Sequence, residues 1–138
     1  MKKNEPVSHI MTQNVLFVNK ADSLRKALDI VRTHHVRHLP VVSEDSVVGI
    51  LSSTDLNRLT FSNLFENEES ADDAIMDMLT IPNVMTDKPV VVNSENSIKE
   101  VAEVFSNKTF HALPVVEDEK LVGIVTTTDV IKYLLDQY

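Results

Sequence analysis

The sequence of 138 residues contains no cysteine, no tryptophan and only two glycines. Without cysteine, neither a disulfide framework nor a thiolate metal site is possible. Two glycines are too few to build a glycine-rich phosphate-binding loop. No apolar run approaches the roughly 20 residues that a membrane-spanning helix needs. These absences exclude several large classes of secreted, membrane-spanning and nucleotide-hydrolysing proteins.

The charge of the chain is unbalanced toward acid, with 21 acidic against 13 basic residues and a formal net charge of −8. This charge disfavours the nucleic-acid backbone and anionic membranes as partners. A small anionic ligand remains compatible, because a local basic cluster can oppose the global sign. Lys2 and Lys3 are followed by no apolar stretch, so no signal peptide is predicted and a cytoplasmic location is expected.

The two glycines occupy the same place in two copies of one pattern. Each copy reads Leu-Pro-Val-Val, a short acidic turn, a strand-like run with the glycine, and then hydroxyl residues ending in aspartate: Leu39 to Asp55 and Leu113 to Asp129. Met11 and Met85 then match without a gap. Self-similarity of this kind predicts a tandem repeat. We divide the chain into repeat 1 over residues 1–60, an acidic linker with a short helix over 61–80, and repeat 2 over 81–138.

Each repeat is expected to fold as strand, helix, strand, strand and helix. A strand is predicted at Val15–Val18, and Asp22 or Ser23 is the expected cap of a helix whose apolar residues recur at helical spacing. Two β-branched runs joined by Ser43–Ser46 predict a hairpin. The second copy repeats this order, with Asn96 or Ser97 as the cap. The fold class is therefore α/β (α+β), and units this small should pack on each other.

The hydroxyl run that ends each copy is a candidate binding feature: Ser52, Ser53, Thr54 and Asp55, then Thr126, Thr127, Thr128 and Asp129. One interpretation is helix capping, which needs only one such side chain. The other is a sugar site, since an ionised aspartate accepts hydrogen bonds from both hydroxyls of a ribose. The adjacent helix N-terminus favours an anion. The repetition favours the ligand interpretation.

A basic patch precedes each Leu-Pro-Val: His34, His35, Arg37 and His38 in the first copy, Lys108 and His111 in the second. Guanidinium and imidazolium groups bind phosphate well; the alternative is a solvated surface charge. A metal site at the three histidines is not favoured, because no carboxylate or cysteine completes a ligand set. Gly49 and Gly123 indicate either close approach of a ligand or backbone, or a bulge with tight packing.

No motif for chemistry accompanies these features. The chain contains no Gly-x-Ser-x-Gly elbow, no Walker phosphate loop and no His-Glu-x-x-His. No nucleophile is paired with a base. Enzymatic activity and a catalytic cofactor are therefore not expected.

The matched elements together resemble a tandem pair of CBS (cystathionine-β-synthase) domains, also called a Bateman module. They are Ile10-Met11-Thr12 with Val84-Met85-Thr86, the two Leu-Pro-Val-Val runs, and the two Gly-Ile runs that end in Thr-Asp. The chain is similar to small stand-alone CBS-pair proteins, including those of the acetoin-utilisation type. The resemblance implies two β-α-β-β-α repeats packed about a pseudo-twofold axis, with two clefts between them.

The resemblance also implies an adenine-nucleotide ligand such as AMP, ADP or ATP, with S-adenosylmethionine or NAD possible. The implied ribose side is Asp55 and Asp129 with their hydroxyl neighbours, and the implied phosphate side is Arg37, His38 and His111. Ala112 stands where many members carry a second basic residue, which implies unequal clefts. The full implied nucleotide site comprises Thr12, Val15, Val36, Arg37, His38, Ser52, Thr54, Asp55, Thr86, Pro89, Phe110, His111, Thr126, Thr128 and Asp129.

The function implied is that of a regulatory, energy-sensing module that changes its contacts with an unknown regulated protein. The alternative is a structural dimerisation module with vestigial clefts. We also expect a homodimer, because apolar residues of the second helix of each repeat and of the linker exceed what a small core absorbs: Leu59, Phe61, Leu64, Phe65, Ile131, Leu134 and Leu135.

Overall fold

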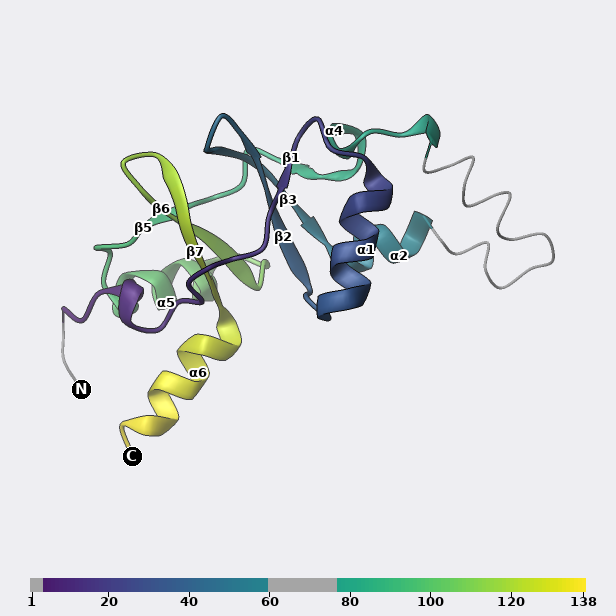
Figure 1. Ribbon diagram of the computed structural model, residues 1–138. Helices are drawn as coiled ribbons and strands as arrows, with labels where there is room; N and C mark the ends of the chain where they lie inside the picture. Colours follow the sequence, from purple (N-terminus) through teal and green to yellow (C-terminus); the bar gives the residue numbers. More distant parts are fainter. Residues whose placement is uncertain (1–3, 60–76) are drawn as a thin grey trace. The chain divides into compact units, whose positions relative to one another are not determined.

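The computed structural model describes residues 4–59 and 77–138 (Figure 1). The chain forms two compact units that are interleaved along the sequence. Unit 1 contains Met1–Val15 and Pro89–Tyr138, and unit 2 contains Leu16–Lys88. The repeats predicted from the sequence follow one another along the chain. The compact units instead exchange the short N-terminal segments of the two repeats.

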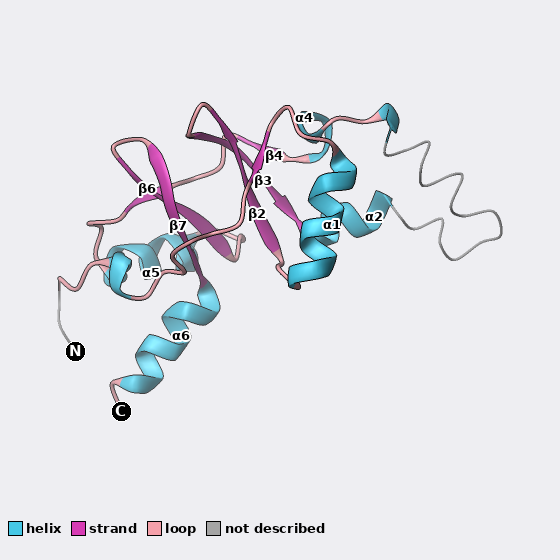
Figure 2. Cartoon of the chain, in the orientation of Figure 1, coloured by secondary structure: helices cyan, strands magenta, loops and turns pink. Residues whose placement is uncertain are grey.

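Unit 2 contains a four-stranded sheet in the order β1-β2-β3-β4 (Figure 2). β1 is Val18–Asn19, β2 His38–Ser43, β3 Ser46–Ser52 and β4 Thr86–Asp87. β1 pairs parallel with β2, and the other pairings are antiparallel. The predicted strand at Val15–Val18 is mostly wrong, because only Val18 of that run is in β1.

Unit 1 contains a three-stranded sheet in the order β5-β6-β7. β5 is Val92–Asn93, β6 Ala112–Glu117 and β7 Lys120–Thr126. Thr12 extends this sheet as an isolated antiparallel bridge to Ile124, with backbone N···O distances of 2.8 and 3.1 Å. In unit 2 the matched residue Thr86 pairs with Ile50. Each sheet is thus completed by the N-terminal segment of the other repeat.

Both predicted hairpins are present, and both turn without glycine. The central residues Glu44 and Asp45 have φ of 50° and 72°, and Asp118 and Glu119 have φ of 51° and 68°. Two-residue hairpin loops of type I′ require positive φ at both positions. Each pairing also shifts register by one residue, beside the position where a valine faces glycine: Val41 with Gly49, and Val115 with Gly123.

The first helix of each repeat is α1, Leu24–His34, and α5, Ile98–Asn107. Of the alternative caps, the serines are correct: Ser23 accepts a hydrogen bond from Lys26 N, and Ser97 accepts one from Glu100 N. The predicted apolar face of α1 is buried throughout, and α5 buries the first members of its face. The residue before each serine instead accepts a hydrogen bond from an upstream backbone N–H.

The second helix of each repeat is α2, Ser53–Leu59, and α6, Thr127–Asp136. Each begins one residue before the predicted Thr-Asp pair. Shorter helices are η1, Val7–His9, and α4, Ile81–Val84. The short linker helix expected near residues 71–79 lies mostly outside the described residues. None of the helices in the described ranges has the length and apolar character needed to cross a bilayer.

Each unit has its own apolar core. The core of unit 2 lies between α1, α2 and the sheet, and includes Leu24, Leu39 and Leu51. The core of unit 1 includes Val101, Leu113 and, from the N-terminal segment, the fully buried Val7. Val7 N also donates to Asn96 O at 2.7 Å. The N-terminal segment of repeat 1 is therefore built into the core of repeat 2. Helices and two sheets together confirm the predicted mixed α+β class.

Candidate functional site

Two candidate sites lie at the turns where β3 and β7 pass into α2 and α6. Site A, in unit 2, is defined by Arg37, His38, Ser52, Thr54 and Asp55. Site B, in unit 1, is defined by His111, Thr126, Thr128 and Asp129. All residues of site A belong to unit 2, and all residues of site B belong to unit 1.

The aspartate of each site is held in a reciprocal capping arrangement. In site B, Thr126 N donates to Asp129 Oδ2 at 2.9 Å, and Asp129 N donates to Thr126 Oγ1 at 3.2 Å. In site A, Ser52 N donates to Asp55 Oδ2 at 3.4 Å, and Asp55 N donates to Ser52 Oγ at 3.0 Å. Capping therefore uses the first hydroxyl and one carboxylate oxygen, and orients the carboxylate on the first helical turn.

The second carboxylate oxygen differs between the two sites. Oδ1 of Asp55 lies 3.9 Å from Nη1 of Arg58. Within residues 4–59 and 77–138, no hydrogen bond or ion pair is formed by Oδ1 of Asp129. Both aspartates are half-buried and Thr54 and Thr128 are exposed, so the sites present acceptor and donor oxygens near the surface.

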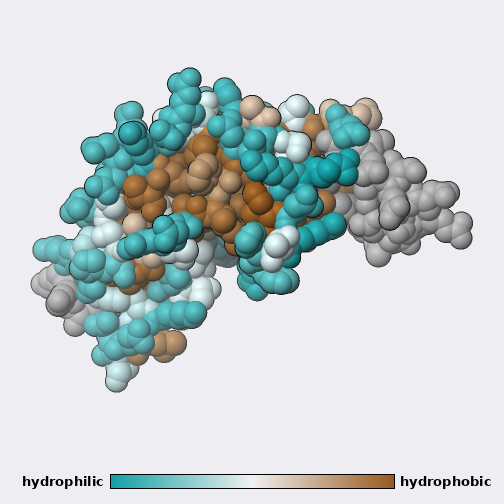
Figure 3. Space-filling model, viewed as in Figure 1, coloured by the Kyte–Doolittle hydropathy of each residue, from teal (hydrophilic) through white to brown (hydrophobic). Residues whose placement is uncertain are grey.

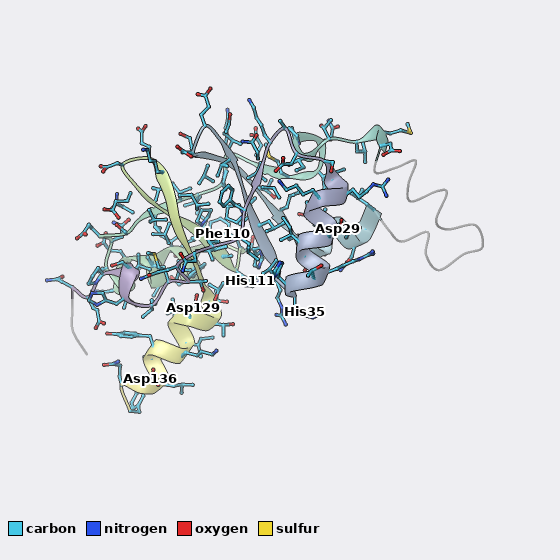
Figure 4. All side chains as sticks on the ribbon, in the orientation of Figure 1. Asp29, His35, Phe110, His111, Asp129 and Asp136 are labelled. Atoms are coloured by element: carbon cyan, nitrogen blue, oxygen red, sulfur yellow. The ribbon has the colours of Figure 1, made fainter. Side chains whose placement is uncertain are left out.

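The basic residues before β2 and β6 lie at these same turns. Ser53 N donates to Arg37 O at 2.8 Å, and Thr127 N donates to His111 O at 3.0 Å. His38 is paired with Ser52 across the hairpin, as Ala112 is with Thr126. The structure thus brings the predicted phosphate side and the predicted ribose side together, at the position where Figure 4 labels His111 and Asp129.

The remaining residues of the implied nucleotide site are divided between the two units. Thr12, Val15, Pro89 and Phe110 belong to unit 1, whereas Val36 and Thr86 belong to unit 2. Phe110 packs against the core of unit 1, and Val36 packs against that of unit 2.

The two strand glycines are explained by packing inside each unit. A Cβ on Gly123 would lie 2.5 Å from Met11 Sδ and 2.9 Å from Thr12 O, and a Cβ on Gly49 would lie 2.9 Å from Met85 Cγ. Of the two interpretations offered by the sequence, bulge and tight packing account for what is seen. The contact of Met11 with Gly123 and of Met85 with Gly49 was not predicted. The equivalent positions of the two methionines in the repeat were the signal from which it could have been found.

His34, His35 and His38 lie around the turn from α1 into β2. In the described part of the chain, no group of three or more histidine and acidic side chains is arranged to hold a metal ion. His34 ends α1, and His35 follows it with a φ of 54°. The backbone therefore turns sharply between these histidines and β2.

Comparison with known families identifies both repeats. The model of the CBS domain matches residues 7–61 and 81–136. Among curated proteins, the chain is similar to the protein MJ1225 of Methanocaldococcus jannaschii, with 28% identity over 133 residues, covering 95% of this chain. The chain spans 48% of that relative's length.

Solved structures with this fold cover almost the whole chain. CBSX2 from Arabidopsis thaliana, a CBS-pair protein, matches with a TM-score of 0.81 and 28% identity, covering 98% of this chain and 97% of that one. CBSX2 in complex with AMP matches with a TM-score of 0.77 and 27% identity, covering 96% and 98%. The CBS domain pair of MJ0100, in complex with 5′-methylthioadenosine and S-adenosyl-L-methionine, matches with 0.74 and 25%, covering 94% and 98%.

Proposed function

The chain belongs to the CBS domain family, and we propose that it is a non-enzymatic regulatory module that binds an adenine nucleotide at sites A and B. The observation that carries this proposal is the duplicated turn. In both units a carboxylate, hydroxyl groups and a basic or titratable side chain surround one strand-to-helix junction. Ribose and phosphate are the chemical groups that such a set recognises.

Two neighbours support the choice of ligand class. CBSX2 has been solved with AMP, and the MJ0100 pair with 5′-methylthioadenosine and S-adenosyl-L-methionine. These three ligands share an adenosine group and differ in what is attached to its 5′ carbon. We therefore propose adenosine recognition as the common property, with AMP, ADP or ATP as the ligand and S-adenosylmethionine or NAD as further candidates.

In the proposed complex the carboxylate divides its two oxygens between protein and ligand. In site B, Oδ2 of Asp129 accepts the hydrogen bond from Thr126 N, and Oδ1 accepts from a ribose hydroxyl. The cap thus fixes the orientation of the carboxylate before a ligand arrives. A preoriented acceptor reduces the entropy that binding costs.

Regulation requires that the ligand bind one arrangement of the chain more tightly than another. Binding of AMP, ADP or ATP would then report the energy state of the cell to a regulated protein, and a cytoplasmic location is part of this proposal. Because the chain spans about half of the relative MJ1225, the regulated activity is left to the partner or to a larger assembly.

The test is a thermal-shift panel of AMP, ADP, ATP, S-adenosylmethionine and NAD. A ligand present at 100 times its dissociation constant stabilises the folded state by about 2.7 kcal/mol. For a chain of this size, that energy raises the melting temperature by roughly 5–15 °C. No shift with any of the five ligands would contradict adenine-nucleotide binding.

A second candidate function is a dimerisation module, and helix α6 favours it. None of its residues is buried, and Ile131, Leu134 and Leu135 are 55%, 43% and 65% exposed. They recur at i, i+3 and i+4, so they form one apolar stripe on the helix; apolar surface is visible along α6 in Figure 3. We propose a second copy of this chain as the partner, since antiparallel pairing about this stripe brings Lys132 of one copy near Asp136 of the other.

Of the other predicted dimer residues, Leu59 is half-buried against the core of unit 2, and Phe61, Leu64 and Phe65 lie outside the described residues.

A further inference from the structure

Sites A and B carry different side chains on nearly the same backbone. From this difference we infer that site A binds a nucleotide through its phosphates, whereas site B binds the uncharged adenosine part of a ligand. The inference rests on the proposed function and adds to it a division of ligand class between the two sites. Three matched positions carry it.

The first matched position is the basic residue at the start of the hairpin. Arg37 and His111 each accept, through the backbone oxygen, a hydrogen bond from the second residue of the hydroxyl run, at 2.8 and 3.0 Å. Both side chains are exposed. A guanidinium is always charged and presents a planar fork of donors that binds phosphate bidentately, whereas an imidazole ring has no such fork. At this position site A is therefore the better phosphate site.

The second matched position is the first residue of the hairpin strands. His38 in β2 is half-buried and faces Ser52, whereas Ala112 in β6 is buried and faces Thr126. Alanine offers no polar group to an anion. The two sites therefore differ in polarity at this position.

The third matched position lies one helical turn beyond the aspartate. Arg58 approaches Oδ1 of Asp55 at 3.9 Å, while the matched Lys132 forms no ion pair with Asp129 in the described ranges. Arg58 thus adds positive charge to site A and competes for the oxygen that would accept a ribose hydroxyl. Asp129 keeps that oxygen available, so site B depends less on phosphate.

The apolar neighbours of the basic residues point the same way. Phe110 precedes His111, and Val36 precedes Arg37; both are half-buried against the cores of their units. An aromatic face stacks on a base without needing charge. Site B therefore combines an aromatic side chain with an available carboxylate, which suits a nucleoside. Site A combines cations with a partly neutralised carboxylate, which suits a nucleotide.

The experiment is titration calorimetry of the full chain with ADP and with adenosine at pH 8. Arg37→Ala removes the guanidinium of site A, and Asp129→Asn weakens site B while keeping an oxygen for the cap. Arg37→Ala is expected to remove most ADP binding and to leave adenosine binding in place, whereas Asp129→Asn is expected to weaken adenosine binding and to leave ADP binding at site A in place. Each loss should be about 10-fold or more, the usual effect of a charge-assisted hydrogen bond.

Exchange variants provide the matched controls. His111→Arg should raise the affinity of site B for ADP about 10-fold, and Arg37→His should lower that of site A by a similar factor, with adenosine affinity unchanged in both. Arg58→Ala should strengthen adenosine binding at site A, whereas Lys132→Ala should leave site B unchanged. Circular dichroism of each variant checks that the fold is retained.

Some outcomes test the division of ligand class between the sites, and others test nucleotide binding itself. Binding at both sites with the same ratio of ADP to adenosine affinity would overturn the division of ligand class and leave nucleotide binding standing. No ADP effect in His111→Arg and Arg37→His would do the same. Absence of any heat with either ligand, or with AMP, would overturn the proposed function itself.

Discussion

The sulfur of Met11 lies 2.5 Å from the point where a Cβ on Gly123 would stand, in space that the glycine leaves open. Met11 comes from the N-terminal segment of repeat 1, and Gly123 lies in the last strand of repeat 2. In unit 2, Met85 covers Gly49 in the same way. The two glycines are thus the positions at which each repeat accepts the N-terminal segment of the other.

A side chain at Gly123 should loosen this contact. Gly123→Ala places a Cβ 2.9 Å from the backbone oxygen of Thr12 as well as against Met11. Because backbone cannot move aside as a flexible side chain does, we expect a loss of about 1–3 kcal/mol in the free energy of unfolding. Urea denaturation measures it.

The internal repeat supplies the control. A Cβ on Gly49 meets only atoms of the flexible Met85 side chain among its nearest contacts, so Gly49→Ala should cost less than Gly123→Ala. Adding Met11→Ala to Gly123→Ala should not restore stability, since the contact with Thr12 O remains. An unchanged urea midpoint in Gly123→Ala would show that the N-terminal segment does not pack this closely.

Removing the N-terminal segment should unfold unit 1 selectively. Val7 is fully buried in that core, and Ile98 N donates to Glu5 O at 2.8 Å. Val7→Ala should cost roughly 1–3 kcal/mol, and deletion of residues 1–12 should cost more. Hydrogen exchange is expected to show lost protection in residues 89–138 and retained protection in unit 2.

Gln13→Ala, at an exposed position of the same segment, is the control and should have little effect. Equal loss of protection in both units after the deletion would indicate that the units unfold together. Retained protection in residues 89–138 would contradict the role of Val7 in that core.

The cap of α5 should make stability depend on acid. Hydrogen bonds from the backbone N–H of Ser97, and then from its side chain, hold the pKa of Glu100 below its ordinary value of 4.5. A lowered carboxyl pKa contributes stability that is fully present above the ordinary value and is lost as pH falls through the folded value. The stability advantage of the wild type over Glu100→Gln should therefore shrink as pH falls below 4.5.

Chemical denaturation at pH 7 and at several pH values below 4.5 measures this difference. Glu103→Gln, on the same helix but outside the capping box, is the control. A constant difference between wild type and Glu100→Gln across that range would show that the charge of Glu100 contributes nothing to the cap.

The apolar stripe of α6 should hold two copies together. Sedimentation at tens of micromolar is expected to show a dimer for the wild type. Leu135→Glu, which places charge on a side chain that is 65% exposed, should give a monomer while ligand-induced thermal shifts persist. Lys99→Glu, on exposed α5 surface, should leave the dimer intact. A monomeric wild type would refute this partner.

Much of the fold was predictable because its signals are local. The face of α1 follows from helical spacing, the hairpins from β-branched runs on either side of acidic turns, and the serine caps from their place before each helix. The position of each hydroxyl run between a strand and a helix was predictable for the same reason. The hydroxyl run and the basic residue before the strand are close in sequence, and the hairpin brings them together.

The exchange of segments was not predictable from the repeat. Self-similarity shows that Met11 and Met85 are equivalent, but it does not state which sheet edge each one joins. Either pairing satisfies the same local pattern, so the choice is made by long-range contacts such as Thr12 with Ile124.

This exchange also bears on what a single repeat is able to do alone. A half-chain comprising residues 77–138 would keep the N-terminal segment of repeat 2, whose Met85 covers Gly49, and would lack Val7, Met11 and Thr12. Gly123 would then lose the methionine that covers it, and Ile124 would lose its backbone partner. Cutting the chain between the repeats would therefore leave each half with a segment that belongs to the other half's core.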